Sequence, residues 1–263
     1  MIGGGGTAAA GRTAPRATSV YVYGVLRRPP SGELASGVRA IEGAGFAALV
    51  SDVPADWRAA GRQDVEAHDR VLAQLLESET VIPMRFGVVM ESDDDVRRLL
   101  LERHADQLAP LFQRLAGRVQ MSVKAYYVDE ALLRRVLARH PQLKRRSKEL
   151  EALPVPTSQQ ERIELGRSVA AAVEEQRALD ERELLAPFAE AADDIRVDPP
   201  ATERQVLNVH LLVDAHGRKQ LDDVVRRLSA EHNGWVAFRY VGPLAPYSFS
   251  DLSLDVEEHE AWD

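Results

Sequence analysis

The residues best suited to acid–base chemistry in this sequence are His68 and Asp69, which follow Glu66 closely. A histidine beside carboxylates can exchange protons near neutral pH. However, helical spacing places His68 on an apolar side with Val65 and Leu72. A histidine in such a position is more often a packed, hydrogen-bonded core residue, so we interpret His68 as structural.

The other residue types that support catalysis or metal binding show no useful spacing. The remaining histidines are scattered: His104, His140, His210, His216, His232 and His259. The sequence has no nucleophile elbow, no His-Glu-x-x-His, no dinucleotide fingerprint and no lysine-bearing phosphate loop. Cysteine is absent, which excludes disulfides and thiolate chemistry and suits a reducing cytosol. We expect no catalytic residue, no cofactor and no metal ion, unless folding assembles a site from distant histidines.

The acidic runs are interpreted as helix boundaries. Ser92 before Asp93, Asp94 and Asp95 predicts the start of a helix, because a hydroxyl caps free backbone amides and carboxylates suit the positive end of the helix dipole. The acidic pair at 193–194 is interpreted as a helix end. Neither run has the spaced oxygen ligands and the glycine of a calcium loop.

The length of the chain bounds the elements that position these residues. With 263 residues, of which 45% are hydrophobic, the chain is long enough for two domains. The first is expected over residues 19–116, with mixed α+β structure. We predict strands at 20–26 and 46–53, a helix over 64–79, and then a long helix that Pro110 kinks or splits. Helical spacing directs these side chains inward: Val65, Leu72, Leu75, Leu76, Val96, Leu99, Leu100, Leu108, Leu111, Phe112 and Leu115.

Between those two helices lies an apolar run, residues 81–89, that Pro83, Arg85 and Gly87 interrupt. Proline removes a ladder donor and glycine has no side chain to pack, so the run predicts two short strands or one bent strand. A guanidinium is seldom buried unpaired, so Arg85 either meets a carboxylate or backbone carbonyls, or lies at the surface. We expect it to tie the bend together. Arg85 and Phe86 are therefore candidates for a structural motif or a partner contact.

Gly117 is interpreted as the break before a second domain, over residues 117–250. From there the sequence predicts the order β-α-β-α-β, in which Gly166 lets a strand pass close to a long helix, and a last short strand at 247–249. This order is close to a modified ferredoxin-like, or split βαβ, domain with long added helices. The predicted elements are strand residues 121–127, a helical stretch over 130–153, a long helix from 161, a strand over 207–213, a helix around 221–228 and a strand over 235–241.

Three segments together resemble the gas vesicle protein F/L family. The first is the histidine-bearing helix with the run at 81–89. The second, Glu-Arg-Ile-Glu-Leu-Gly at 161–166, opens the long helix as the family's central helix opens. The third, Gly-Pro-Leu-Ala-Pro-Tyr-Ser-Phe at 242–249, is similar to the family's C-terminal motif. The segments occur in the family's order, so the resemblance covers roughly residues 19–250.

The chain departs from the family pattern in two places. Val88 stands in place of a threonine, and Leu244-Ala245 stand in place of a tryptophan and a proline. The third segment also carries two prolines, which hold an extended chain from which Tyr247 and Phe249 project. We expect those two aromatic residues either to form a partner surface or to close the core of the second domain.

The resemblance implies a non-enzymatic protein of gas vesicle formation, cytoplasmic and associated with the vesicle. The implied partners are the small hydrophobic shell protein and other gas vesicle accessory proteins. A subunit that exposes apolar surface before it assembles self-associates at random unless a soluble partner covers it. We therefore predict an assembly factor or minor shell component that binds the shell subunit.

Two alternative functions and the two ends of the chain remain to be considered. A net charge of −8 argues against a general nucleic-acid binder, but Arg134 to Lys148 is strongly basic. We favour a solvated helix face over RNA binding there, because aromatic residues are not interleaved. A ligand-binding or enzymatic module on the ferredoxin-like fold is the other alternative. We expect residues 1–18 to be a disordered tail, residues 251–263 to be an acidic tail that is disordered or docks on a partner, and no membrane span.

Overall fold

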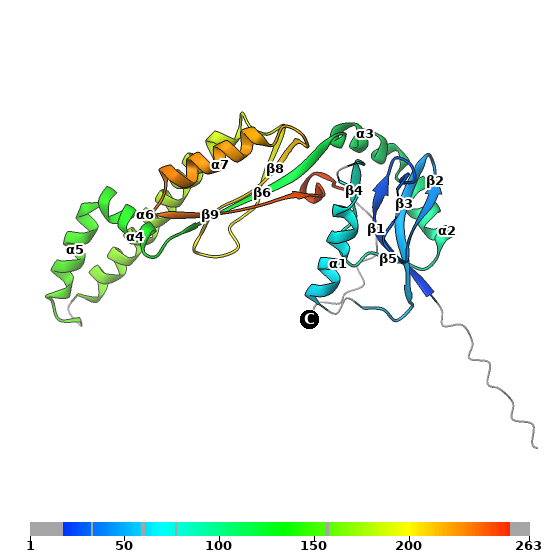
Figure 1. The fold of residues 1–263 in the computed structure, drawn as a ribbon. Coiled ribbons are helices and arrows are strands. Elements are labelled where there is room, and N and C mark those ends of the chain that lie inside the picture. The colour runs from blue at the N-terminus through cyan, green and yellow to red at the C-terminus, as the bar shows by residue number, and fades with distance from the viewer. Residues whose placement is uncertain (1–17, 33, 59–60, 77, 156–157, 253–263) are drawn as a thin grey trace, which may run out of the picture.

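The computed structural model of the chain describes residues 18–32, 34–58, 61–76, 78–155 and 158–252. They form two antiparallel sheets, one in each half of the chain, with helices packed on both (Figure 1). The α+β class and the two-domain organisation are as the sequence predicts. The two expected tails lie almost wholly outside the described residues.

The first sheet has the strand order β2-β3-β1-β4, and β5 also pairs with β1. The strands are β1 (Thr18–Leu26), β2 (Val38–Gly43), β3 (Phe46–Pro54), β4 (Val81–Pro83) and β5 (Val89–Met90). Strand β2 is not among the strands that the sequence predicts. It joins β3 through Ala44 and Gly45, whose φ values of 50° and 79° are both positive, as a tight two-residue hairpin turn requires.

Helices cover both faces of this sheet. Helix α1 (Arg62–Ala73) packs on one face, and the continuous helical stretch of α2 (Asp93–Asp95), η1 (Val96–Glu102) and α3 (Ala105–Leu115) packs on the other. Residues of β3 therefore alternate between two cores: Phe46, Ala48 and Val50 face the long helical stretch, whereas Ala47 and Leu49 face α1.

Two details of these helices correct the sequence analysis. The long stretch is interrupted at residues 103–104 and not at Pro110, which lies inside α3. Segment η1 is π-helical, so each N–H bonds the carbonyl five residues earlier, and Val96 and Leu101 share the buried side while Leu99 is 39% exposed. Val65 is also 39% exposed, because α1 buries only the side that carries His68 and Leu72.

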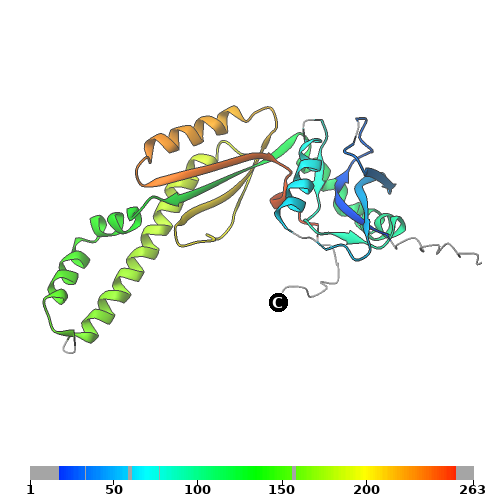
Figure 2. The same ribbon diagram turned by 60° about the horizontal axis from the view of Figure 1, so that its bottom comes forward.

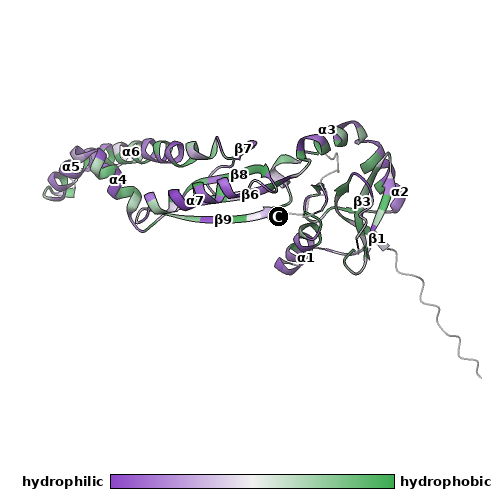
Figure 3. Cartoon of the chain, turned by 45° about the horizontal axis from the view of Figure 1, so that its top comes forward, coloured by the Kyte–Doolittle hydropathy of each residue, from purple (hydrophilic) through white to green (hydrophobic). Residues whose placement is uncertain are grey.

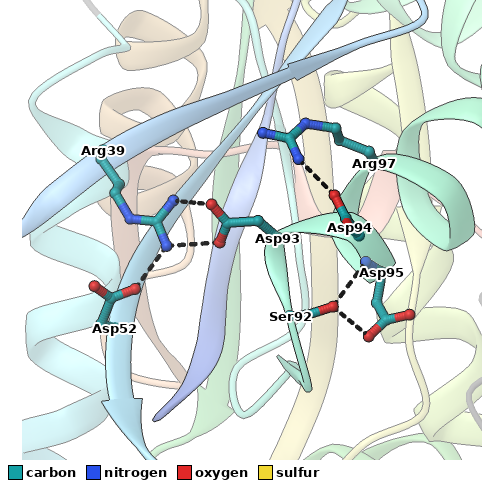
Figure 4. Close-up of polar contacts among 7 residues, drawn as sticks. All are labelled: Arg39, Asp52, Ser92, Asp93, Asp94, Asp95 and Arg97. Atoms are coloured by element: carbon teal, nitrogen blue, oxygen red, sulfur yellow. Dashed lines mark hydrogen bonds and ion pairs between the residues drawn. The ribbon is translucent and has the colours of Figure 1, made fainter.

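The start of α2 is held in the predicted way and by an unpredicted clamp (Figure 4). Ser92 Oγ accepts a hydrogen bond from the Asp95 backbone N–H at 3.2 Å and donates one to Asp95 Oδ2 at 2.7 Å. Arg39 on β2 donates to both oxygens of Asp93, at 2.9 and 2.7 Å, and to Asp52 Oδ1 at 2.6 Å. The hydrogen bonds from Arg39 lower the pKa of Asp93. This clamp joins the edge strand β2 to the helix that crosses it.

The second sheet has the order β7-β8-β6-β9. Its strands are β6 (Arg118–Tyr127), β7 (Asp194–Val197), β8 (Gln205–Asp214) and β9 (Val236–Leu244). With α6 (Gln159–Leu185) after β6 and α7 (Lys219–Glu231) after β8, the chain order is βαββαβ, the ferredoxin-like plan. The sequence analysis missed β7: Asp194 begins this strand and does not end a helix. Residues 247–249 form a 3₁₀ turn, η4, in place of the expected short strand.

A helical arm extends from this sheet on the side remote from the first sheet (Figures 1 and 2). We define the arm as α4 (Ala131–Arg139), α5 (Pro141–Glu151) and the first half of α6, and η3 (Ala186–Phe188) closes the other end of α6. Gly166 lies on the arm. A Cβ added to it would have open space around it, so the expected close approach of a strand is wrong.

The C-terminal segment returns to the first half of the chain. Phe249 is fully buried in the core between the first sheet and the α2–α3 stretch, and this core also contains Leu212 of β8. Ala245 is buried in the core beneath α1, with Tyr247 packed against that core. The expectation that Tyr247 and Phe249 close the second domain's own core is therefore wrong, because both side chains join the first half.

Candidate functional site

Six ring side chains form a cluster between β1, α1 and the bend after β4. We call this the aromatic cluster, and its members are Tyr21, Tyr23, Trp57, His68, Phe86 and Tyr247. Tyr21 lies at its centre. The centroid of the Tyr21 ring is 4.9 Å from that of Tyr23, 5.1 Å from Trp57 and 6.4 Å from Phe86, in edge-to-face arrangements. Such pairs are favourable beyond their buried area, so the cluster stabilises this corner of the fold.

The Tyr21 hydroxyl connects the helix to the bend. It lies 2.7 Å from His68 Nδ1 and accepts a hydrogen bond of 3.3 Å from the backbone N–H of Gly87. Burial raises the pKa of Tyr21 to about 12, so the hydroxyl stays protonated and we assign it as the donor to Nδ1. Burial also lowers the pKa of His68, against smaller opposing effects of Asp69 and the Met84 backbone. His68 is therefore a neutral, packed histidine, as the sequence analysis predicts.

The bend after β4 is held by its backbone. The Met84 N–H donates to the Tyr23 carbonyl at 2.9 Å, and the Val22 N–H donates to the Val88 carbonyl at 3.0 Å. Arg85 is exposed and makes no hydrogen bond or ion pair with any residue that the structure describes. The expectation that Arg85 ties the bend to a carboxylate or a carbonyl is therefore wrong, because β1 supplies those bonds.

Phe86 behaves differently from its neighbour. Its side chain is half-buried, and its ring meets the His68 ring edge-on at 5.9 Å between centroids. Val89, opposite Tyr21 across the β1–β5 pair, is 36% exposed. The bend thus presents one free cation and two partly exposed apolar side chains at the edge of the aromatic cluster.

The C-terminal motif completes the cluster. The Tyr247 ring stacks on His68 at 6.2 Å between centroids, and its hydroxyl donates to Asp69 Oδ1 at 2.8 Å. Burial and this hydrogen bond raise the pKa of Tyr247. The Ser248 N–H donates to Gln120 Oε1 of β6 at 2.9 Å. Of the three segments singled out in the sequence, the structure brings the first and the third together, while the second lies on the distant arm (Figure 1).

The aromatic cluster also contains residues that sequence reasoning missed. The sequence predicts Tyr21 and Tyr23 only as strand residues and indicates no role for Trp57. The available signal was the alternation Tyr-x-Tyr, which places both rings on one side of a strand. No pattern along the sequence indicates that Trp57 joins them.

A second polar chain crosses the middle of the other sheet. Ser122 Oγ lies 2.8 Å from His210 Nδ1, and His210 Nε2 lies 3.0 Å from Asp198 Oδ2. These residue types form catalytic triads, but there Nε2 faces the serine and a buried carboxylate orients Nδ1. Here the two nitrogens are reversed, Ser122 is 6% exposed and the Asp198 side chain is 55% exposed. The arrangement suits a structural chain between strands better than a nucleophile.

The described residues contain no group of three or more histidine, aspartate or glutamate side chains placed to hold a metal ion. None of the helices within them is long and apolar enough to cross a membrane. A hollow of about 330 Å³ lies between the loop at 30–35 and the end of α1, and it includes no titratable pair placed for catalysis.

Comparison with known proteins confirms the family that the three segments of the sequence indicate. The family model described as gas vesicle synthesis protein GvpL/GvpF matches residues 19–251. The chain belongs to this family. Gas vesicle protein F of Streptomyces sp. (strain CB03234) is 36% identical over 242 residues, which cover 88% of this chain and 99% of that protein. Members of the GvpL/GvpF family are gas vesicle proteins, so the chain has a role related to gas vesicles.

Solved structures support the fold of this GvpL/GvpF member. The crystal structure of GvpF from Anabaena sp. PCC7120 aligns with a TM-score of 0.80 and 26% identity, covering 90% of this chain and 99% of that one. GvpF from Microcystis aeruginosa aligns with a TM-score of 0.75 and 24% identity, covering 89% and 99%. The second likeness concerns the fold alone.

Proposed function

We propose that this chain is a non-enzymatic assembly factor or minor structural component that binds the small hydrophobic gas vesicle shell protein. The observation that carries the proposal is an exposed patch at the bend after β4. Arg85 is free of partners among the described residues, and Phe86 and Val89 expose apolar surface beside it, as does Val65 on α1, three residues before the His68 that Phe86 contacts. We call these four residues the bend patch.

The bend patch lies on a rigid support. Phe86 packs on Tyr21 and His68, and Val89 pairs with Tyr21, so the exposed atoms are held in place before a partner arrives. A surface that is ordered in advance loses less conformational entropy on binding. Partly exposed apolar groups beside a cation also suit a hydrophobic partner with an acidic or carbonyl-rich edge. Other gas vesicle accessory proteins are further partners under this proposal.

The C-terminal motif takes a supporting role in this proposal. Phe249 is fully buried and Tyr247 is bonded to Asp69, so neither side chain is free for a partner without leaving its present contacts. We therefore place Arg85 and Phe86 in the contact surface, and assign Tyr247 and Phe249 to the scaffold that positions it.

The test is co-expression with the shell protein followed by affinity capture of this chain. Arg85→Glu and Val65→Asp, each at an exposed position, should reduce the captured shell protein severalfold, because the first reverses the charge of the patch and the second places a charge in an apolar contact. Ile163→Asp is the matched control, since Ile163 is 43% exposed on a different helix, α6. All three variants should melt like the unmodified chain. The proposed surface would be contradicted if the Arg85→Glu and Val65→Asp variants captured as much shell protein as the Ile163→Asp control.

The two alternative functions receive less support. The Ser122–His210–Asp198 chain has the wrong orientation for a triad, which weakens the enzymatic alternative. In the basic stretch, Arg135 is engaged by Asp180 and Glu183, and Arg139 lies 3.5 Å from Glu175. The cations of this stretch that make no ion pair with a described residue are considered below with a protein partner in place of RNA.

A further inference from the structure

The arm carries a group of basic side chains on α4 and α5 that the shell-binding proposal does not use. Its members are exposed and make no ion pair with any residue in the described ranges: Arg134, Lys144, Arg145 and Lys148. Lys144 and Lys148 are four residues apart on α5, and Arg145 is three residues before Lys148, so the three cations project from one side of the helix. We call these four residues the basic face.

The carboxylates of α5 leave this charge uncompensated. Glu149 lies 3.5 Å from Arg146, and Glu151 accepts a hydrogen bond of 3.3 Å from Ser147. Figure 3 shows α5 as mainly hydrophilic. Apolar side chains on the same arm are nevertheless exposed: Leu133 by 43%, Leu153 by 49%, Val155 by 63% and Ile163 by 43%. The arm thus offers positive charge together with apolar contacts, which fits an acidic segment that also carries apolar residues.

The chain itself contains such a segment. Residues 251–263 hold Asp251, Asp255, Glu257, Glu258, Glu260 and Asp263, with Leu252, Leu254, Val256 and Trp262 between them, and they contain no lysine or arginine. We propose that the acidic C-terminal segment of one copy binds the basic face on the arm of a second copy, so that the protein associates head to tail.

The length of the segment argues against binding within one copy. Asp251 lies 3.6 Å from Arg196, which pairs with His210 halfway along the second sheet, and Leu252 packs against the first core. From that level, the path along β6 and then along α6 to the middle of α5 is about 35 Å. Glu260 is eight residues beyond Leu252 and reaches at most about 28 Å when fully extended.

The acidic residues up to Glu260 therefore fall short of the α5 cations of their own chain, and only Asp263, eleven residues beyond Leu252, reaches them when the segment is fully extended. A second copy has no such restriction. Because the two contact surfaces differ, the contact is head to tail and can repeat without closing, so association should grow with protein concentration beyond a dimer. Exposed charge pairs are screened by salt, so the affinity should fall roughly tenfold or more between about 0.05 M and about 0.5 M salt.

The experiment uses sedimentation velocity on the full chain and three variants. One variant ends at Leu252, one combines Lys144→Glu, Arg145→Glu and Lys148→Glu, and the control combines Lys219→Glu, Arg227→Glu and Arg239→Glu. The control changes the net charge by the same amount at exposed cations away from the arm. We expect the full chain and the control to associate with rising concentration, and the truncated and arm variants to remain monomers.

Mixing gives the decisive result. The truncated variant retains the arm and the arm variant retains the acidic segment, so an equal mixture should form a one-to-one complex although neither associates alone. A labelled peptide of residues 251–263 should bind the truncated variant and not the arm variant. The inference is overturned if the full chain stays monomeric at low salt, if the mixture forms no complex, or if the arm binds an RNA oligonucleotide but not the peptide. None of these outcomes depends on shell-protein capture.

Discussion

The Tyr247 hydroxyl donates a 2.8 Å hydrogen bond to Asp69, a residue 178 positions earlier in the chain. The next residue, Ser248, donates its backbone N–H to Gln120 on β6, and Phe249 enters the first core. Three consecutive residues thus contact α1, the second sheet and the first core. This segment fixes the orientation of the two halves and, through His68, supports the bend patch.

These contacts predict unequal effects of two substitutions. Tyr247→Phe removes one hydrogen bond while keeping the ring, so it should lower the free energy of unfolding by ~1 kcal/mol. Phe249→Ala leaves a cavity in a closed core and should lower it by ~3–5 kcal/mol. Urea unfolding of each variant measures both. In a Tyr247→Phe background, Asp69→Asn should have little further effect, and a full additional loss would show that the bond does not hold the segment.

His68 predicts a pH dependence of stability. Its folded pKa is lowered by burial, so the unfolded state binds a proton more readily than the folded state. The stability from neutral His68 is complete above the unfolded pKa of ~6.5 and is lost as pH falls towards the folded pKa, by up to ~1.4 kcal/mol per pH unit. Tyr21 and Tyr247, which face the ring, have raised pKa values and stay neutral in this range, while Asp69 opposes the shift.

The measurement is the difference between two pH profiles of the unfolding free energy. His68→Gln keeps an acceptor for the Tyr21 hydroxyl but removes the titrating group, so its profile between about pH 7.5 and 5.5 should be flatter than that of the unmodified chain. Parallel profiles would mean that His68 does not titrate differently in the two states.

Much of the local structure follows from the sequence because it depends on nearby residues. The Ser92 cap and the packed state of His68 rest on spacings of three or four residues, which the fold preserves. The ferredoxin-like plan follows from alternation along β6 and β8, which is strong because these central strands are buried against helices. These features need no knowledge of distant contacts.

The features that sequence reasoning missed are made by distant contacts. Strand β7 has four residues, all of them half-buried or exposed, and exists because it pairs with β8. The aromatic cluster draws on β1, a loop, α1, the bend and the C-terminal segment. The sequence predicts an internal hydrogen bond or ion pair for Arg85, because a cation interrupts an apolar run. In the structure the Arg85 side chain is exposed, and the backbone of the bend is hydrogen-bonded to β1. Position along the chain does not reveal such an arrangement.

Gly166 predicts a stabilising substitution. It lies in the interior of α6, and a Cβ at this position would meet nothing within 4 Å. Gly166→Ala removes conformational freedom from the unfolded chain without a clash, so it should raise the free energy of unfolding by ~0.5–1 kcal/mol. Gly24→Ala is the contrasting variant, because its Cβ would lie 2.8 Å from the Ile82 carbonyl oxygen and should destabilise by ~1–3 kcal/mol. A loss of stability in Gly166→Ala would indicate a contact on the arm that the open space does not suggest.

The arm is anchored by a buried carboxylate, Asp180. Its side chain is fully buried and accepts hydrogen bonds from Tyr127 Oη at 2.8 Å, from Gln176 Nε2 at 2.7 Å, and from Arg135 Nε and Nη2 at 3.0 and 2.7 Å. The Arg135 guanidinium also lies 3.9 Å from the centroid of the Trp235 ring. Asp180 thus joins α6 to both α4 and β6 at the base of the arm.

Asp180→Ala should therefore lower the free energy of unfolding by ~3–5 kcal/mol, because it leaves Tyr127, Gln176 and a half-buried guanidinium without their acceptor. Glu183→Ala is the matched control. Glu183 also contacts Arg135, at 3.1 Å, but its side chain is 47% exposed, so its loss should cost no more than ~0.5 kcal/mol. Hydrogen exchange over α4 and α5 should accelerate in Asp180→Ala and not in Glu183→Ala, since only the first variant releases the arm from β6. If both variants unfold at the same urea concentration, Asp180 is not the anchor and the orientation of the arm must rest on the packing of α4 against α6.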